Sequence, residues 1–528
     1  MALGALALTR AGAPTRVGGG PPPMTGLPRW PGNLAAALVL ALCLGTLLPL
    51  ALGAGGLALA PSDLAVLRFT LLQALLSAAL SCLLAIPLAR ALARRRFPGR
   101  GLLITLLGAP FILPVIVAIL GLLAIFGRAG LLNAALGPLG LPPIRIWGLQ
   151  GILLAHVFFN LPLATRFLLI GWQSIPAEHV RLAASLRLPP GPVLERPMLR
   201  RTLPGAFTAV FLLCLTSFAT ALTLGGGPAA TTVELAIYQS LRFDFDPGRA
   251  AVLALVQIAL CALAALLAAR ITPPPAAAPG LDRPTLPPPS GPWARLVDAA
   301  VLVLAAAFLL LPLAAVVLRG APALADLPPP VWAAAARSVV MALASAALCI
   351  ALTLALALAP GRLSTLAGAV PLATSALALG TGLFLVLHPL TDPQNLALPL
   401  TVLVNAVMAL PFALRATAPA LDRIEATHGR LATALGLTGL ARLRLLILPR
   451  LAGPLGFAAG LAAALSMGDL GVIVLFGGQD QPTLPLAMYR LMGAYRMEDA
   501  AGAALLLLIL SLALFRLFDR GHRPDAHA

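Results

Sequence analysis

Lysine is absent from the 528-residue sequence, and charged residues of either sign are few. All 36 basic residues are arginine, 18 residues are acidic, and charged residues make up 10% of the chain. A soluble globular protein carries about 25% charged residues, so this chain has too few to cover a surface that faces water. Without lysine it cannot contain the usual nucleotide-binding P-loop, whose lysine contacts the phosphates. If ATP drives the protein's work, another polypeptide binds that ATP.

Cysteine and histidine are also scarce, with five and six residues. Every cysteine lies in an apolar run, which predicts small core residues and not a disulfide framework. The histidines show no metal-ligand spacing, and isolated His156 and His388 are interpreted as packed or hydrogen-bonded. We therefore expect no metal site, no catalytic residue and no cofactor in this chain.

Long hydrophobic runs dominate what is present. Hydrophobic residues make up 60% of the chain, and the mean hydropathy is +0.97. A membrane-spanning helix needs about 20 mostly apolar residues, and only helices or closed barrels satisfy their backbone in lipid. The sequence predicts an all-α polytopic membrane protein with spans at residues 34–58, 67–89, 102–126, 147–171, 205–225, 250–270, 297–318, 332–358, 364–388, 396–416, 452–476 and 501–518.

A proline-rich segment divides the spans into two groups of six. It is too polar to span a membrane and predicts an extended linker. The first apolar run is longer than the roughly 7–15 residues of a signal peptide's apolar region, which favours an uncleaved anchor. The predicted organisation is a disordered cytoplasmic tail at 1–33, halves at 34–270 and 296–518, the linker at 271–295, and a cytoplasmic tail at 519–528.

Arginine placement predicts the orientation of the chain. If the N-terminus is cytoplasmic and the spans alternate, 27 of the 36 arginines lie on the cytoplasmic side. This asymmetry follows the positive-inside rule, and it predicts that both termini are cytoplasmic. The positive charge is spread over short loops between spans, which disfavours nucleic-acid binding.

A short basic motif occurs once in each half. "EHVRLAASLRL" (Glu178–Leu188) returns 249 residues later as "THGRLATALGL" (Thr427–Leu437), with six identities in eleven positions. Both copies fall in predicted cytoplasmic loops, and an even number of spans separates them. The halves are therefore expected to be parallel repeats with the same orientation.

Each copy predicts a short helix with small and apolar residues on one side. Such a helix permits close docking into a groove of another protein; the alternative is a membrane-surface helix whose arginines meet lipid phosphates. Lipid attraction explains the charge but not the matched identities, which favours docking. The candidate docking residues are Glu178, His179, Arg181, Leu182, Ala183, Leu186 and Pro197 in the first copy, and His428, Arg430, Leu431, Ala432, Leu435, Gly436 and Pro449 in the second.

The repeated loop resembles the cytoplasmic "EAA" loop of ABC-importer permeases. Arg430-Leu431-Ala432, then Gly436 and a later Pro449, follow that pattern, although arginine replaces the leading glutamate and Arg187 occupies the glycine position of the first copy. The resemblance implies a type I importer permease fold. It also implies that the loops dock two ATPase subunits, which use ATP and Mg²⁺, on the cytoplasmic side of the bacterial inner membrane.

Two longer stretches narrow the resemblance. "SFATALTLGGGPAATTVELAIYQSLRFDFDPGRAAVLALVQ" (Ser217–Gln257) and "SMGDLGVIVLFGGQDQPTLPLAMYRLMGAYRMEDAAGAALLL" (Ser466–Leu507) are similar to bacterial thiamine ABC-importer permeases. This implies transport of thiamine, with its phosphates as further candidates, and a periplasmic thiamine-binding protein as a partner. A ferric-iron importer permease and a stand-alone secondary transporter remain as alternatives.

Asp469 is the one acidic residue well inside a predicted span. A carboxylate within the membrane is costly and is a functional candidate by default; it could meet a cationic substrate, or cap a helix break beside Gly468 and Gly471. Its counterpart in the first half is near Thr220, which carries no charge. The candidate residues of a translocation path are Ser217, Thr220, Ser466 and Asp469. The duplicated external segments 228–249 and 479–499 are expected either to receive a binding protein or to be re-entrant connectors.

Overall fold

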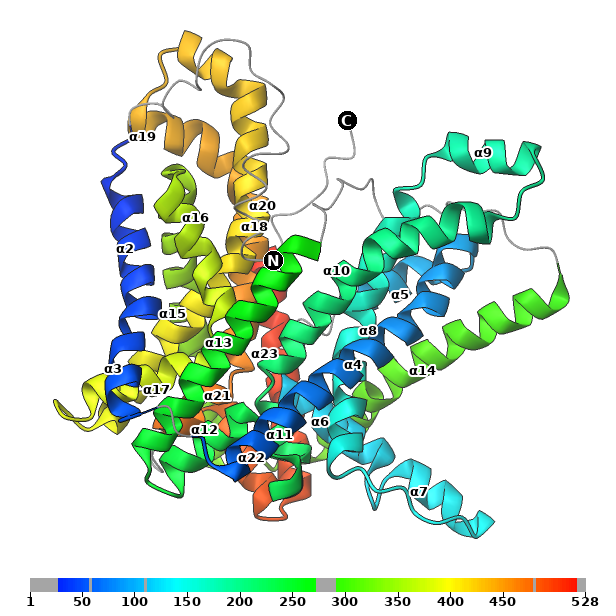
Figure 1. The fold of residues 1–528 in the computed structure, drawn as a ribbon, viewed down its shortest axis with the longest axis horizontal. Coiled ribbons are helices and arrows are strands. Elements are labelled where there is room, and N and C mark those ends of the chain that lie inside the picture. Colours follow the sequence, from blue (N-terminus) through cyan, green and yellow to red (C-terminus); the bar gives the residue numbers. More distant parts are fainter. Residues whose placement is uncertain (1–26, 57–58, 109–111, 272–290, 478–480, 520–528) are drawn as a thin grey trace.

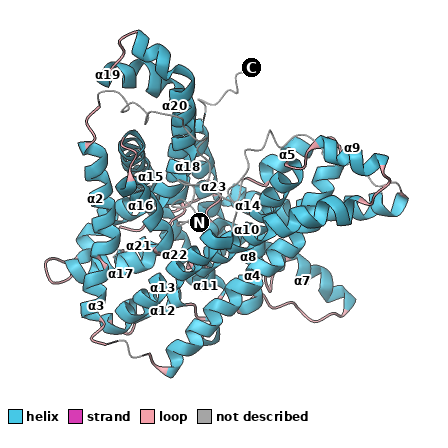
Figure 2. Cartoon of the chain, turned by 45° about the horizontal axis from the view of Figure 1, so that its top comes forward, coloured by secondary structure: helices cyan, strands magenta, loops and turns pink. Residues whose placement is uncertain are grey.

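The computed structural model describes residues 27–56, 59–108, 112–271, 291–477 and 481–519. Within these residues helices joined by loops and turns make up the protein, and no strand occurs (Figure 2). Eleven helices, or pairs of short helices in sequence, are long and apolar enough to cross a membrane. A twelfth candidate is a helix pair bent by 100° at residues 362–387. The predicted all-α polytopic fold is confirmed.

The spanning segments of the first half are α2 with α3, α4, α6 with α7, α8, α10 and α13. Their bounds are Trp30–Gly45 with Leu47–Gly53, Pro61–Arg94, Val115–Phe126 with Leu131–Leu136, Leu149–Gln173, Arg196–Leu215 and Pro247–Ile271. Shorter helices lie between them: α5 (Arg100–Leu106), α9 (Ala177–Ser185), α11 (Ala219–Leu224) and α12 (Val233–Arg242).

The second half repeats this order. Its long helices are α14 (Pro292–Ala323), α15 (Pro329–Leu358), α18 (Ala397–Ala434), α20 (Leu448–Met467) and α23 (Met497–Asp519), and α16 (Arg362–Ala369) and α17 (Ala376–Leu387) form the bent pair. The short helices are α19 (Gly439–Arg442), α21 (Gly471–Phe476) and α22 (Leu484–Gly493). The predicted linker and the two tails lie mainly outside the described residues.

Besides the bent pair in the span predicted at 364–388 and the short gap between α2 and α3, three predicted spans are interrupted. The predicted span at 102–126 covers α5 and α6, but the candidate span in the structure is Val115–Leu139, so the predicted start was wrong. Pro114, which has no N–H to donate, immediately precedes α6. The spans at 205–225 and 452–476 are each broken once, between α10 and α11 and between α20 and α21. Irregular backbone within a membrane is tolerated only where protein or a cavity surrounds it. These breaks therefore lie at the centre of the fold, and they bring polar residues there.

The first helix of each half packs against the other half. α2 contacts α15 and α16, and α14 contacts α4 and α6. Glycines permit close approaches between the halves: a methyl group at Gly121 of α6 would lie 2.5 Å from the Pro312 carbonyl oxygen, and one at Gly382 of α17 would lie 2.5 Å from Cβ of Thr46. Small residues let neighbouring helix backbones approach closely in this way.

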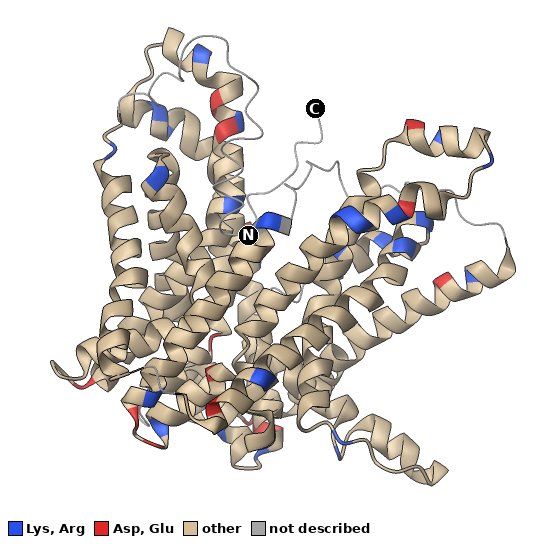
Figure 3. Ribbon diagram, viewed as in Figure 1, with Lys and Arg blue, Asp and Glu red and all other residues tan. Residues whose placement is uncertain are grey.

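Charged residues gather mainly at the two ends of the molecule, and a largely uncharged band lies between them (Figure 3). In Figure 1, α9 and α19 lie at the upper end on opposite sides, whereas α7, α12 and α22 lie at the lower end. Both copies of the repeated motif are thus at the same end, as parallel repeats require. All five cysteines are free and buried, which confirms the prediction that they are core residues.

Candidate functional site

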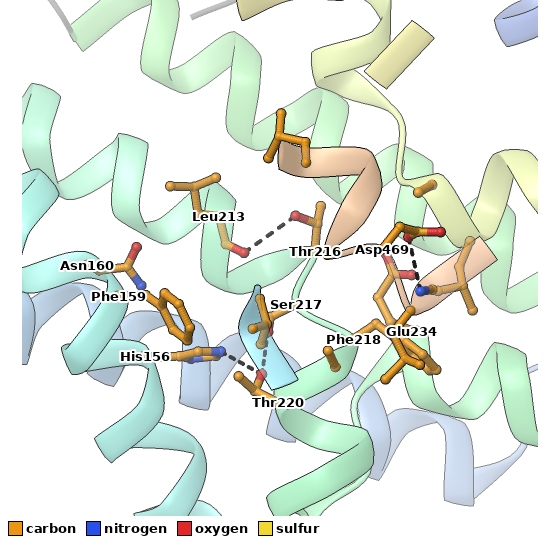
Figure 4. A pocket seen from close by; sticks show the side chains of 18 of the residues that line it. His156, Phe159, Asn160, Leu213, Thr216, Ser217, Phe218, Thr220, Glu234 and Asp469 are labelled. Carbon is orange, nitrogen blue, oxygen red and sulfur yellow. Dashed lines mark hydrogen bonds between the residues drawn. The ribbon is translucent and has the colours of Figure 1, made fainter. Parts of the chain in front are cut away.

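A cavity of about 350 Å³ lies between the two halves. Its walls come from α6, α8, the α10–α11 break and α12 of the first half, and from α17 and the α20–α21 break of the second. Small-molecule sites typically occupy about 300–1,000 Å³, so the cavity has the size of a small ligand. Figure 4 shows its polar residues, among them His156, Ser217, Thr220, Glu234 and Asp469.

Three of the four residues predicted for a translocation path line this cavity. They are Ser217 and Thr220 at the α10–α11 break and Asp469 at the α20–α21 break. Ser466 is not among the cavity-lining residues; it is buried and donates to Ser345 of α15 over 3.0 Å. The structure therefore brings one polar break from each half to a common space.

The break in the first half is held by a chain of hydrogen bonds. Ser77 of α4 contacts Nδ1 of His156 at 2.9 Å, and Nε2 of His156 contacts the Thr220 hydroxyl at 3.0 Å. The Ser217 hydroxyl also bonds to that of Thr220. His156 is thus hydrogen-bonded, as the sequence suggested, but it also lines the cavity.

The second half contains an equivalent cluster with different chemistry. Asn405 of α18 lies 249 residues after His156 and donates to Ser466 at 3.1 Å. Asp469 lies 249 residues after Thr220, and the Asn405 amide lies beside its carboxyl group. A histidine–threonine pair in one half therefore corresponds to an asparagine–aspartate pair in the other. The repeat spacing of His156 and Asn405 was the sequence signal that could have found this cluster.

Asp469 caps a helix break, as one of its two sequence alternatives predicted, and it also lines the cavity. It lies at the helix break, where its Oδ1 accepts the Gly471 N–H at 3.1 Å. Its Oδ2 is buried and has no hydrogen-bond partner. A helix-break cap uses one carboxylate oxygen, so the second remains for another group.

Glu234 is a cavity residue that the sequence reasoning missed. It lies in the first turn of α12, within the predicted external segment 228–249. Its side chain is 1% exposed, and its Oε1 has no hydrogen-bond partner. The matching position of the second copy is Pro485, so the repeat gave no signal for an acidic site here.

Aromatic rings separate the cavity from a second pocket of about 480 Å³. Phe218 lines the first cavity, and its ring contacts that of Tyr238 at 5.6 Å edge to face. Tyr238 lines the second pocket together with Trp147, Phe243 and Tyr489. α12 and α22 are both largely buried, so much of each external segment packs into the fold.

The two copies of the repeated motif differ in their helices. The first is the separate helix α9, which begins after Pro176, whereas the second is the end of the 38-residue helix α18. The expectation of two similar loops was wrong in this respect. The physical reason is that Glu425 occupies the position of Pro176, so nothing interrupts the second helix.

Both copies end alike despite this difference. The Leu188 N–H donates to the Ala183 carbonyl at 2.8 Å, and the Leu437 N–H to the Ala432 carbonyl at 2.9 Å. The residue before each leucine is left-handed: Arg187 has φ 52° and Gly436 has φ 67°. This is the Schellman arrangement that ends many helices.

The candidate docking residues separate into exposed and buried groups. Ala183 and Ala432 are buried within this chain, so they support the loops and do not form an outer surface. The exposed members are Glu178, His179, Arg181, Leu182, Leu186, Pro197, Arg430, Leu431, Leu435, Gly436 and Pro449, and His428 is half-buried. Four leucines at matched positions, each 57–66% exposed, therefore form the apolar part of the surface.

Ion pairs lie near both motifs along the chain. Glu195, just before α10, pairs with Arg90 and Arg94 of α4. In the second half, Arg442 of α19 pairs with Glu425 of α18. α19 also accounts for the three additional residues between the second motif and Pro449.

No cluster of metal-binding side chains was found among the residues that the structure describes. Two parallel helical halves, a cavity between them and a matched pair of exposed motifs at one end define a duplicated membrane permease. No protein-family model matches the chain.

The chain is 44% identical over 516 residues to the thiamine transport system permease protein ThiP of Brucella abortus, covering 93% of this chain and 94% of the relative. It is 42% identical over 531 residues to ThiP of Salmonella typhimurium, covering 95% and 98%. It belongs to the family of thiamine transport system permease proteins. The molybdenum transport system permease protein ModB of Mycobacterium bovis is 30% identical over 40% of this chain and 81% of its own length, so one such permease corresponds to less than half of the chain.

Proposed function

We propose that this chain is the permease subunit of an ATP-binding cassette importer that carries thiamine across the bacterial inner membrane. The full-length similarity to thiamine permeases carries the proposal. Thiamine is a permanent cation with two aromatic rings. The cavity between the halves offers carboxylate oxygens and aromatic side chains, and it has the volume of a small-ligand site.

The energy source is proposed to lie in two separate ATPase subunits. The sequence has no lysine for a P-loop, and each half presents an exposed apolar motif. Leu182 and Leu186 in the first half, and Leu431 and Leu435 in the second, are the contacts that a groove on each ATPase subunit would cover. ATP and Mg²⁺ would be used there, and a periplasmic thiamine-binding protein would deliver the substrate at the opposite end.

This proposal places α9 and α19 in the cytoplasm. Single cysteines at Ser185 and Thr433, both exposed, should react only with reagents that reach the cytoplasm. Cysteines at Phe245 and Tyr495, which are 81% and 91% exposed, should react only from outside. The five native cysteines are buried, so background labelling should be low. Reaction of Ser185→Cys from outside would reverse the proposed orientation.

Uptake in cells tests the substrate. The permease is expressed with its partner subunits in a bacterium that lacks its own thiamine uptake and cannot synthesise thiamine. We expect growth on low external thiamine and accumulation of the labelled vitamin, both lost when the permease is omitted. Accumulation of ferric iron in place of thiamine would favour the iron importer.

A further inference from the structure

Glu234 is a buried acidic residue, and the helix that carries it does not require an acidic residue at this position. It lies in the first turn of α12, where a carboxylate suits the helix dipole. The Thr232 hydroxyl already accepts the Leu235 N–H as the N-terminal cap of this helix. The equivalent helix α22 forms with Pro485 at the matching position and has no acidic residue in its first turn. The dipole therefore explains why a carboxylate is tolerated but not why it is buried.

The carboxyl group of Glu234 has unused bonding capacity. Ser375 and Gln257 lie near it, yet Oε1 has no hydrogen-bond partner and is shielded from solvent. Neither Glu234 nor Asp469 takes part in an ion pair between described residues. A buried charge is normally paired or fully hydrogen-bonded because removing it from water is costly. Each of these two groups therefore has no charged partner and keeps one oxygen without a hydrogen bond.

The cavity supplies the place where such a partner would bind. Glu234 and Asp469 are the only acidic residues among the described residues that line it, and no arginine is among them. Figure 4 shows them on the same side of the view, with the His156–Thr220 pair on the other. Phe159 and Phe218 also line the cavity, and aromatic faces attract organic cations. Burial raises the pKa of Glu234 to about 8, and a cation bound beside it would favour the charged form.

We propose that Glu234 and Asp469 together bind the positively charged group of an organic cation, with one carboxylate contributed by each half of the permease. This inference rests on the proposed function and assigns its recognition chemistry. The neutral His156–Thr220 side then faces the uncharged part of the substrate. Because the two carboxylates belong to different halves, a bound cation links them, and separation of the halves weakens binding.

The first test is equilibrium binding of radiolabelled thiamine to the purified permease–ATPase complex without the binding protein. Glu234→Gln keeps the shape of the side chain and removes its charge. We expect it to weaken thiamine binding about tenfold or more, with unchanged yield and ATPase association. The matched control is Glu498→Gln, which changes an exposed glutamate in the first turn of α23 and should have no effect. Thiochrome, an uncharged oxidation product of thiamine, should bind wild type and Glu234→Gln equally.

The second test uses the wild-type protein and so does not depend on how a variant folds. A hydrophobic carbodiimide modifies buried protonated carboxyl groups, and mass spectrometry locates the modified residue. Thiamine at a concentration that saturates binding should slow modification of Glu234, and thiochrome should not.

The two proposals fail in different ways. Wild-type thiamine binding by Glu234→Gln, or unchanged modification of Glu234 in the presence of thiamine, would overturn the paired-carboxylate inference even if the wild-type permease imports thiamine. A wild-type permease that imports no thiamine would overturn the proposed function. The carboxylate pair would then stand only if benzyltrimethylammonium bound the wild type and bound Glu234→Gln about tenfold more weakly.

Discussion

Asp469 shows how one carboxylate can hold the backbone and remain free for a ligand. Its Oδ1 bonds to the Gly471 N–H, and its Oδ2 has no partner. Asn caps a helix about as well as Asp, so Asp469→Asn should preserve the break between α20 and α21. We expect normal insertion and ATPase association but thiamine uptake lowered about tenfold or more, because the charge is lost. The measurement is uptake rate per inserted permease at saturating binding protein; a wild-type rate would remove Asp469 from the substrate path.

Arg187 occupies a backbone conformation that costs a side chain energy. Its φ of 52° lies in the left-handed region, and the matching residue in the second copy is Gly436. Arg187→Gly should therefore stabilise the end of α9 by about 1 kcal/mol. Hydrogen exchange of the Leu188 amide, which bonds to Ala183, measures this effect and should become slower.

The reciprocal change in the second copy is the control. Gly436→Arg should speed exchange of the Leu437 amide, whose bond to Ala432 is equivalent. If Arg187→Gly sped exchange at Leu188, the left-handed residue would not be a source of strain.

The sequence predicted individual site residues only where the repeat or an isolated charge pointed to them. Asp469 was visible as a carboxylate in an apolar run, and the 249-residue spacing relates it to Thr220. The same spacing relates His156 to Asn405, but neither residue is charged and both lie in ordinary apolar helices. Glu234 gave no signal, because its place in the cavity depends on how α12 packs back into the fold.

Among the helices, two glycines lie where the first spanning segment of one half packs against the other half. Gly121 faces Pro312 of α14, and Gly382 faces Thr46 between α2 and α3. Leucine at either position should overpack this contact and cost about 1–3 kcal/mol or more. We expect a lower yield of folded protein and a lower melting temperature for Gly121→Leu and Gly382→Leu. Gly101→Leu is the control, since nothing lies within 4 Å of a methyl group there; equal loss in all three would mean that the close approach is unimportant.

The exposed leucines of the two motifs form the proposed docking surface. Replacing Leu182 and Leu431 with serine removes apolar area that a partner would bury, while leaving the supporting alanines in place. We expect the double variant to insert normally and to bind the ATPase subunits more weakly by about tenfold or more. Co-purification and ATPase titration measure this.

Leu139→Ser with Leu141→Ser is the matched control, because both leucines are exposed and lie within five residues of the end of α7, which is at the opposite end from α9 and α19. Full ATPase affinity in the Leu182 and Leu431 variant would mean that docking occurs elsewhere.

The sequence predicted the spanning elements better than their breaks. Hydrophobic length identified the regions of the eleven candidate spans and of the bent pair among the described residues, because lipid requires about 20 apolar residues for each span. It placed the third span at 102–126, where the structure has Val115–Leu139. It did not separate α10 from α11, since residues 216–218 are compatible with a continuous helix, whereas the break between α20 and α21 was one of the two alternatives given for Asp469. Nor did it predict that α18 continues through the second motif, although the absence of a proline at Glu425 explains the result.

For the molecule as a whole, we propose that substrate binding between the halves is coupled to ATPase subunits at one end. The internal repeat gives each half one docking motif, so the two halves are alike in the parts that would contact the ATPase subunits. The cavity is asymmetric in charge. When the two halves are aligned, Asp469 corresponds to Thr220, and Glu234 corresponds to Pro485. One substrate can therefore meet two different surfaces while both halves move alike.

Reconstitution in liposomes tests the coupling between substrate binding and the ATPase subunits. The purified permease, its ATPase subunits and its binding protein are combined, and labelled thiamine uptake is measured together with ATP hydrolysis. We predict uptake that requires ATP, both partners and an intact permease, and hydrolysis stimulated by thiamine-loaded binding protein. Thiamine uptake that proceeds equally without ATP or the ATPase subunits would contradict the account and favour a stand-alone transporter.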